Sequence, residues 1–400
     1  MEGFFYECET NALGPYDFIE FCEGFNKKPL PDIKVPKEVE EIINKLEEKD
    51  FRAYVVGGAV RNLLINKEPK DWDICTNATP LQIEEVFRGY QVLETGIKHG
   101  TVSIIINKTP YEITTFRTEG KYLDGRHPSY VTFVENLKED LSRRDFTINA
   151  MALNVRNRDV LDAFSGLEDI EKKIVKCVGK PEERFSEDGL RILRAIRFAA
   201  QLNFKIDRET KKAIFAKKEL LNKISRERIM SEITKILQAK HGEQYILDYA
   251  EVFCEQFMLR LHNFKTINCS EEDWLLKLGH LLVDNNPEMV EKSLKNLKFD
   301  NSSVKIVKGI VQCLQDTETN MKQLLRKYGE EVVRRIFPEE FKQVEGPYLI
   351  EHLDINGNDL IEMGLEGKAI GKLLEELLEK CIYQPELNKR EELLKLATEK

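Results

Sequence analysis

Two carboxylates, Asp71 and Asp73, stand two positions apart in the stretch DWDICT. On a β-strand such residues point to the same face, with Cα atoms roughly 6.6 Å apart. Paired carboxylates can hold divalent ions, which stabilise the attacking and the leaving oxygen of a phosphoryl transfer. Oxygen-only ligands favour Mg²⁺. We therefore predict a catalytic metal site at Asp71 and Asp73, with Glu112 on a later strand as a candidate third carboxylate.

A glycine turn that precedes Asp71 by thirteen residues is a candidate phosphate site. Gly57 and Gly58 follow a short apolar run, and a helical pattern begins directly after them. Backbone N–H groups at such a turn bind anions, and glycine lets a phosphate come close to the backbone. Arg61, in the first helical turn, could hold the same anion with two N–H groups. We predict that Gly57, Gly58 and Arg61 bind phosphates, although such a turn can also be purely structural.

The stretch RRDFTINAM, residues 143–151, places Arg144 beside Asp145. Guanidinium groups next to a carboxylate suit a polyanion that carries hydroxyls, such as a nucleotide. We predict that Arg144 contacts a phosphate and that Asp145 accepts a hydrogen bond from a ribose hydroxyl. The alternative is a helix start that is held by salt bridges.

The stretch EDGLRILRAIRF, residues 187–198, carries one acid and three arginines at helical spacing. On a helix they form a stripe opposite an apolar face. The four residues are Asp188, Arg191, Arg194 and Arg197. A solvated helix face is the ordinary alternative, but three arginines on one face repel one another unless an anion meets them.

Asp188 and Arg191 lie a helical turn apart and are predicted to be neighbours on the surface. Together they offer a hydrogen-bond acceptor beside donors. The pairing edges of cytosine and adenine each present an amino group beside an acceptor nitrogen, whereas uracil and guanine present a carbonyl beside an N–H. The pair would therefore accept C and A and reject U and G.

These candidates need secondary structure to bring them together. The predicted elements are helices at 37–50, 60–65 and 79–87 and strands at 53–56, 72–75, 101–106 and 111–116, the last two forming a hairpin. From about residue 180 the helical spacing continues almost to the end, and strand patterns disappear. The fold class is therefore α+β, with a small mixed sheet first and helices after it.

The composition excludes several classes of protein. A net charge of −9 excludes a uniformly basic nucleic-acid coat, although residues 201–240 hold eleven Lys or Arg against five acids. Eight cysteines without a CxxC pair predict reduced thiols in a cytoplasmic protein. The N-terminus lacks a signal-peptide pattern, and no apolar run is long enough to span a membrane.

Four motifs in this order, GGAVR, DWDICT, RRDFTINAM and EDGLRILRAIRF, resemble those of the class II tRNA nucleotidyltransferases. This family, which includes CCA-adding enzymes and bacterial poly(A) polymerases, belongs to the DNA polymerase beta-type nucleotidyltransferase superfamily. YEITTFR and the Ser225–Ile229 stretch add to the resemblance. It implies an α+β head followed by an all-helical neck, body and tail. The implied limits are an N-terminal extension of unknown role at 1–32, the head at 33–155, the neck at 156–250, the body at 251–345 and the tail at 346–400.

The resemblance also implies a reaction, the template-independent addition of C, C and A to the 3′ end of tRNA from CTP and ATP. It implies that Asp71 and Asp73 hold Mg²⁺, that Gly58, Arg61, Arg144 and Asp145 contact the nucleotide, that Asp188 and Arg191 template the base, and that Arg194 and Arg197 complete the pocket. The basic stretch 191–240 is expected to dock the tRNA acceptor stem through its phosphates.

Three alternatives stay open within and beyond the family. Enzymes that add only CC are thought to lack a loop that residues 116–133 match, which favours an enzyme able to add the terminal A. An A-adding specialist and a poly(A) polymerase share the motifs, although the acidic C-terminal end differs from the basic extension of the polymerases. A helical RNA-binding scaffold with a decayed head is disfavoured, because the metal, phosphate and templating residues are all present.

Overall fold

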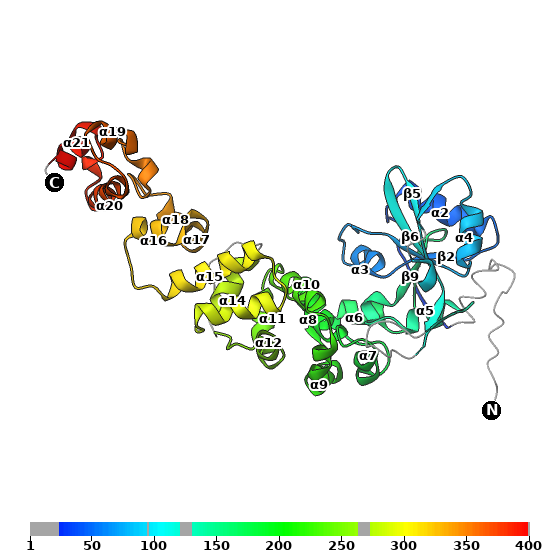
Figure 1. Cartoon of the computed structure of the whole chain (residues 1–400). Coiled ribbons are helices and arrows are strands. Elements are labelled where there is room, and N and C mark those ends of the chain that lie inside the picture. Colours follow the sequence, from blue (N-terminus) through cyan, green and yellow to red (C-terminus); the bar gives the residue numbers. More distant parts are fainter. Residues whose placement is uncertain (1–23, 94–95, 121–129, 263–272, 399–400) are drawn as a thin grey trace, which may run out of the picture. The chain divides into compact units, whose positions relative to one another are not determined.

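The computed structural model describes residues 24–93, 96–120, 130–262 and 273–398 (Figure 1). The chain divides into two compact units, Met1–Glu232 and Ile233–Lys400. The N-terminal unit contains the sheets, and the described part of the C-terminal unit is helical. The predicted α+β class is confirmed, whereas the five domain limits stay predictions.

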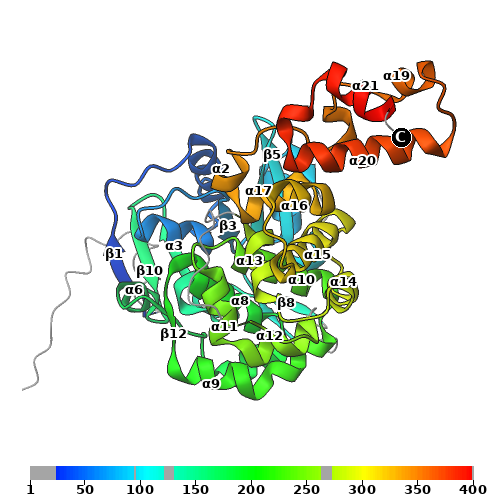
Figure 2. The ribbon, with the colours of Figure 1, turned by 90° about the vertical axis from the view of Figure 1, so that its left-hand side faces the viewer.

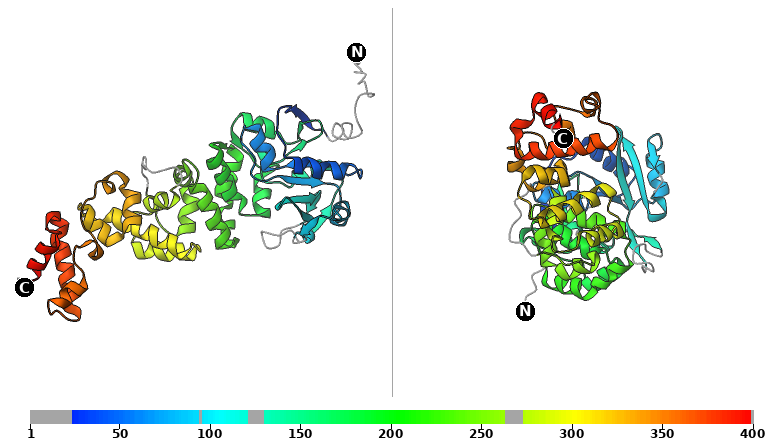
Figure 3. Two further views of the ribbon diagram at one scale, coloured as in Figure 1. Left: turned by 90° about the horizontal axis from the view of Figure 1, so that it is seen from above. Right: turned by 60° about the vertical axis from the view of Figure 1, so that its left-hand side comes forward.

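A mixed eight-stranded sheet is the centre of the N-terminal unit, in the order β1-β10-β9-β2-β3-β6-β5-β4. Its strands are β1 (Asn26–Pro29), β2 (Ala53–Val56), β3 (Asp73–Thr76), β4 (Gln91–Leu93), β5 (Thr101–Ile106), β6 (Thr109–Thr115), β9 (Met151–Asn154) and β10 (Asp159–Asp162). β3 and β6 run parallel, and the other pairs are antiparallel. The strands, blue to blue-green in Figure 3, are twisted relative to one another. The sheet extends beyond the predicted head on both sides, because β1 and β10 lie outside residues 33–155.

Both faces of the central strands are buried. Alternate residues point to opposite faces, so Val55 and Ile74 join one hydrophobic cluster and Tyr54 and Cys75 join another. The first cluster includes residues of α2 (Lys37–Glu47), α3 (Gly58–Leu64) and α4 (Pro80–Val86), and the second those of α5 (Leu137–Ser142). Helices on both faces hold the strand ends, and therefore the site residues beyond them, in fixed positions.

Most predicted elements of the head are confirmed, with one shift that matters for the site. The hairpin of β5 and β6 turns through Asn107 and Lys108, whose φ angles are 51° and 66°. The predicted strand 72–75 is shifted, because β3 begins at Asp73. Val56 is the last β2 residue opposite β3, and the chain turns away at Gly57. Asp71 therefore lies in the segment that leads into the strand, two residues before its first residue, Asp73.

The rest of the N-terminal unit is mainly helical. Its further elements are β7 (Arg117–Glu119), β8 (Val131–Phe133), η2 (Thr147–Asn149), α6 (Gly166–Glu171), β11 (Ile174–Val175), α7 (Pro181–Glu187), α8 (Arg191–Leu202), β12 (Lys205–Ile206), α9 (Arg208–Lys217), η3 (Lys218–Lys223) and the start of α10 (Arg226–Leu237). The expectation that strands disappear from about residue 180 is wrong at one place, because β12 pairs with β11. β7 and β8 flank the predicted loop, of which residues 121–129 lie outside the described part.

The C-terminal unit is built from amphipathic helices. They are α11 (Gly242–Asp248), α12 (Ala250–Phe257), α13 (Trp274–Leu281), α14 (Pro287–Asn296), α15 (Asn301–Gln315), α16 (Met321–Tyr328), α17 (Glu330–Ile336), α18 (Pro338–Phe341), α19 (Gly357–Glu362), α20 (Lys368–Tyr383) and α21 (Arg390–Thr398). Figure 2 shows α19, α20 and α21 gathered as one group, and they share a hydrophobic cluster. Among the described helices, none has the length and apolar character that a membrane crossing requires.

Candidate active site

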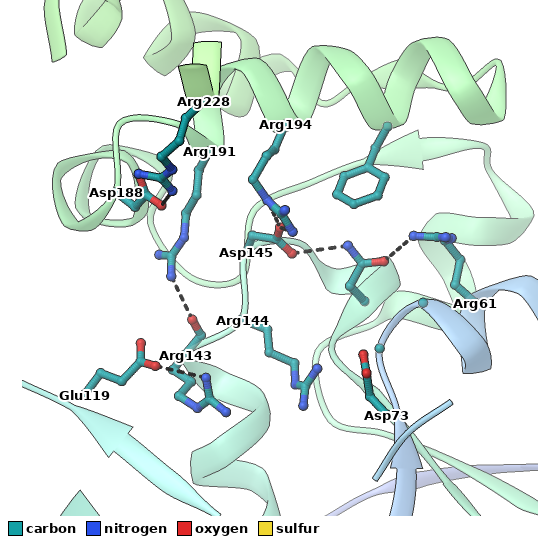
Figure 4. A pocket seen from close by; sticks show the side chains of 14 residues that line it. Arg61, Asp73, Glu119, Arg143, Arg144, Asp145, Asp188, Arg191, Arg194 and Arg228 are labelled. Atoms are coloured by element: carbon teal, nitrogen blue, oxygen red, sulfur yellow. Dashed lines mark hydrogen bonds and ion pairs between the residues drawn. The ribbon is translucent and has the colours of Figure 1, made fainter. Parts of the chain in front are cut away.

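A cavity of about 410 Å³ in the N-terminal unit collects most of the predicted residues (Figure 4). Its lining comprises Gly57, Gly58, Arg61, Asp73, Glu119, Arg143, Arg144, Asp145, Asn149, Asp188, Arg191, Arg194, Phe198 and Arg228. The volume falls in the range of small-molecule sites. The abundance of arginine among the lining residues indicates a polyanionic ligand.

The glycine turn forms one side of the cavity. Gly57 has a φ of 73°, in the region that favours glycine. A Cβ atom there would also lie 3.2 Å from Arg144 Nη1 and 3.8 Å from Asp73 Oδ2. The backbone conformation therefore favours glycine where β2 passes into α3, and a larger residue would also press on the Arg144 guanidinium. Gly58 begins α3 and lines the cavity beside it.

Arg61 extends from α3 into the cavity and is held by neutral groups. Its Nη1 donates to Asn149 Oδ1 at 2.7 Å, and its Nε and Nη2 donate to Asn62 Oδ1 at 3.2 and 2.9 Å. The guanidinium carbon lies 5.1 Å from the centroid of the Phe198 ring. Burial lowers the pKa of Arg61 to about 10, which still leaves it cationic at neutral pH. Arg61 is thus a fixed positive charge beside the glycine turn.

Three carboxylates lie near one another at this side of the site. Asp73 lines the cavity, whereas Asp71 and Glu112 do not. Burial raises the pKa of Asp73, with Arg144 opposing and Asp71 adding to the shift. Burial, followed by the charges of Asp73 and Asp71, raises the pKa of Glu112. The carboxylates therefore repel one another.

This donor set fits a divalent cation, because a cation between the carboxylates would relieve their repulsion. All three candidates supply oxygen ligands. In the described residues, no group of three or more His, Cys, Asp or Glu side chains is arranged to hold an ion. The fit therefore rests on the pair Asp71 and Asp73 rather than on a closed cage of protein ligands.

The two arginines of RRDFTINAM are anchored by one buried acid. Asp140, which is fully buried, lies 2.8 Å from Arg143 Nη2 and 3.4 Å from Arg144 Nη2. Burial alone would raise the pKa of Asp140, but the two arginines outweigh it and hold the pKa below its usual value. Arg143 also pairs with Glu119 at 3.0 Å. These contacts leave Arg144 directed into the cavity, near Asp73 (Figure 4).

Both carboxylate oxygens of Asp145 accept hydrogen bonds. Oδ1 accepts from the Phe146 N–H at 2.8 Å and from Asn149 Nδ2 at 3.2 Å. Oδ2 accepts from Arg194 Nε at 2.8 Å and from Arg194 Nη2 at 2.5 Å. Burial would raise the pKa of Asp145, but Arg194 overcomes this effect and the pKa falls to about 2. Because an ionised carboxylate has about four acceptor positions, this one is filled.

The arginines of α8 do not form the solvated stripe of the alternative interpretation. Each has a carboxylate partner: Arg191 pairs with Glu187 at 2.5 Å, Arg194 with Asp145 at 2.5 Å, and Arg197 with Glu232 at 3.2 Å. Arg191 and Arg197 are buried. The repulsion among the three arginines is thus offset by acids of the protein itself. Arg197 does not line the cavity and stacks on Phe198, 4.3 Å from the ring centroid.

The prediction of one continuous helix through Asp188 and Arg191 is wrong. α7 ends at Glu187, α8 begins at Arg191, and Asp188 between them is extended, with φ −138° and ψ 107°. A Cβ atom on Gly189 would lie 2.9 Å from Leu220 Cβ, so the turn passes close to η3. Asp188 Oδ1 accepts from the Leu190 N–H at 2.9 Å, which competes with helix formation. Asp188 and Arg191 nevertheless both line the cavity.

Asp188 is held by a residue to which the sequence assigned no role. Arg228 of α10 donates from Nη2 to Asp188 Oδ2 at 2.8 Å. Arg191 instead donates to Glu187 and, through Nη2, to the Arg143 carbonyl oxygen at 3.1 Å. The acceptor and the donors of the predicted base-reading pair are therefore positioned by separate partners (Figure 4).

The residues that line the cavity differ in part from the site residues predicted from the sequence. The predicted residues that do not line the cavity are Asp71, Glu112 and Arg197. The lining residues that were not predicted are Glu119, Arg143, Asn149, Phe198 and Arg228. Four of the five lie within motifs named above, and Glu119 lies two residues after YEITTFR, so the motifs themselves were the available signal.

Comparisons with known proteins identify similar chains. A family model described as "Poly A polymerase head domain" matches residues 53–176, and one described as "Probable RNA and SrmB- binding site of polymerase A" matches 203–251. A protein of Pediococcus pentosaceus, named CCA-adding enzyme, is 37% identical over 370 residues, 88% of this chain and 90% of the relative. One of Enterococcus faecalis with the same name is 37% identical over 392 residues, 90% of this chain and 95% of the relative.

Solved structures are similar as well. The Bacillus stearothermophilus CCA-adding enzyme in complex with CTP has a TM-score of 0.67 at 28% identity, covering 90% of this chain and 96% of that one. The Thermotoga maritima CCA-adding enzyme complexed with tRNA has a TM-score of 0.69 at 21% identity, covering 94% and 99%, and shows the shared fold.

Proposed function

This chain belongs to the family of CCA-adding enzymes, and on that premise we propose that its cavity adds C, C and A to the 3′ end of tRNA from CTP and ATP. The observation that carries the proposal is the content of one cavity. It combines a carboxylate of the metal pair, arginines for a triphosphate and an Asp/Arg pair for a base edge. The tRNA 3′-hydroxyl attacks the α-phosphate of the bound nucleotide, and pyrophosphate leaves.

Asp71 and Asp73 would hold divalent ions, and we propose Mg²⁺ because the candidate ligands are carboxylates. Bound ions of this kind lower the pKa of the attacking hydroxyl and neutralise the leaving pyrophosphate. Arg61 and Arg144 face the space beside Asp73 and bind the triphosphate. Because both guanidiniums are already fixed by hydrogen bonds, they need little reorganisation when the nucleotide enters. Glu112 remains a candidate for a minor role near the ions.

We propose that Asp188 and Arg191 read the base. Asp188 accepts a hydrogen bond from the amino group of cytosine or adenine, and Arg191 donates to the ring nitrogen. Uracil and guanine would face these groups with the opposite pattern, leaving buried polar groups unpaired. Asp145 acts on the nucleotide by holding Arg194, because a ribose hydroxyl could be accepted only by displacing one of its present donors. Arg197 supports the same pocket through its stacking on Phe198.

We propose that the basic stretch 191–240 binds the phosphates of the tRNA acceptor stem. We also propose that the enzyme works in the cytoplasm. Lys211 and Lys212 of α9 are exposed and suit phosphate contacts. Binding of tRNA should weaken steeply with salt, and Lys211→Glu with Lys212→Glu should reduce that salt dependence. Salt-independent binding that the substitutions leave unchanged would contradict this docking surface.

The proposed reaction is tested by supplying Mg²⁺, a tRNA transcript that ends before CCA, and CTP alone, ATP alone or both. We expect a product three nucleotides longer only when both are present. Extension by ATP only on a transcript that already ends in CC would identify an A-adding specialist, and open-ended ATP addition would identify a poly(A) polymerase. No addition by the folded protein would support the scaffold alternative.

A further inference from the structure

Asn149 joins two sides of the cavity through a single amide group. It ends η2, is 7% exposed, and lines the cavity. Its Oδ1 accepts from Arg61 Nη1 at 2.7 Å, and its Nδ2 donates to Asp145 Oδ1 at 3.2 Å. Since one end of an amide accepts and the other donates, these two contacts fix its orientation.

The contacts extend into a chain that crosses the cavity. Arg61 comes from the glycine turn at the start of α3, and Asp145 holds Arg194 of α8. Arg61, Asn149, Asp145 and Arg194 are therefore linked in sequence by hydrogen bonds. Asn149 is the one uncharged member, and it stands between a cation and an anion that attract each other.

This arrangement explains why an amide suits the position. A direct ion pair with Asp145 would draw the Arg61 guanidinium away from the glycine turn and neutralise it. The amide satisfies Arg61 without adding a charge and keeps it beside Gly57 and Gly58. A smaller apolar residue would leave Arg61 and Asp145 each short of a partner in a buried site.

We propose that Asn149 is a positioning residue that holds Arg61 in register with Asp145 and Arg194, so that the phosphate-binding guanidinium of Arg61 keeps its place in the cavity. The inference rests on the proposed function. Asn149 acts through Arg61, and it contributes equally to the use of CTP and ATP, because it lies among the phosphate-side residues and not beside Asp188.

The test is a double-mutant cycle of Asn149→Ala and Arg61→Ala, read as kcat/KM for CMP addition and for AMP addition. We expect Asn149→Ala to lower kcat/KM about 10- to 100-fold for both nucleotides, as loss of a hydrogen bond to a charged group does. The double variant should be no worse than Arg61→Ala alone. If Asn149 only supported the fold, its substitution would lower kcat/KM further in the double variant than Arg61→Ala does alone.

Two further variants keep the result interpretable. Asn154→Ala, another buried asparagine with no place in the cavity, should leave kcat/KM unchanged and controls for burial. Asn149→Ser, which is too short to reach both partners, replaces the alanine variant if thermal unfolding shows that variant to be unfolded. Losses that multiply in the cycle, or a wild-type rate for the Asn149 variants, would overturn the inference. An inactive wild-type protein would instead contradict the proposed function.

Discussion

Arg228 Nη2 lies 2.8 Å from Asp188 Oδ2, across a sequence separation of 40 residues. The two side chains are 24% and 15% exposed, so the pair is largely shielded from water. Arg191, only three positions from Asp188, is held by Glu187 instead. The carboxylate that would read the base is thus oriented by α10, and the neighbouring guanidinium is oriented by α7.

Arg228→Ala should impair the choice of nucleotide. Without its partner, Asp188 is free to turn, so kcat/KM for CTP and ATP should fall about 10- to 100-fold, as loss of a charge-assisted hydrogen bond does. The relative use of UTP should rise. Incorporation from each of the four nucleotides measures both effects.

Glu227→Ala is the control for that variant, because Glu227 is exposed on the same helix and does not line the cavity. It should behave as wild type. Unchanged nucleotide choice in Arg228→Ala would show that Asp188 needs no support from α10.

Asp73→Asn should abolish most of the activity while the protein stays folded. The carboxylate lines the cavity and belongs to the pair that would hold Mg²⁺, and loss of such an electrostatic group typically costs about 100- to 1000-fold in rate. Glu112→Gln should lower the rate much less, because Glu112 does not line the cavity. Chelation should stop the wild-type reaction, and Mg²⁺ should restore it. Comparable losses in the two variants would instead give Glu112 an equal share in the metal site.

Asp145→Asn should change how stability depends on pH. The pKa of Asp145 is about 2 in the folded protein, below the ordinary value of about 3.9. The ionised form therefore stabilises the fold above about pH 4, and this stability is lost as pH falls toward 2. The shift corresponds to about 2–3 kcal/mol. Chemical unfolding should show the variant less stable by about that amount or more at pH 7. The difference in unfolding free energy between variant and wild type should become smaller below pH 4. A difference that does not change with pH would contradict the ion pair with Arg194.

Lys277→Met should destabilise the C-terminal unit. Lys277 is 1% exposed, and its Nζ donates to the carbonyl oxygens of Leu237 and Ala239 at 3.1 and 2.7 Å and lies 3.3 Å from Glu243 Oε2. Removing one partner of a buried ion pair typically costs about 3–5 kcal/mol. Calorimetry should show a lower unfolding temperature.

Lys292→Met on the exposed surface of α14 is the matched control, and it should unfold like the wild type. The rate per folded molecule should be unchanged in both lysine variants. A wild-type unfolding temperature in Lys277→Met would mean that the lysine does not stabilise the end of α10.

Local patterns predicted the head well, because strands, turns and glycine positions depend on near neighbours in the chain. The hairpin through Asn107 and the glycine turn at Gly57 are of this kind. The break at Asp188 was not predicted, because it depends on the approach of Gly189 to Leu220 in η3.

Contacts between residues that are far apart in the chain could not be predicted from the sequence either. A helical wheel displays the residues of one helix, so it could not show that Arg197 meets Glu232 or that Asp188 meets Arg228. Motif membership pointed to the region of Asn149 and Arg143, but only the folded chain shows which atoms they contact.

The central claim is that a single cavity serves both CTP and ATP through Asp188 and Arg191. Competition binding in the presence of Mg²⁺ and without tRNA tests it most directly. We predict that CTP and ATP displace each other fully with one nucleotide bound per chain, that UTP and GTP displace neither, and that Asp188→Ala removes this selectivity. Simultaneous binding of CTP and ATP to one chain, or equal displacement by UTP, would contradict the claim.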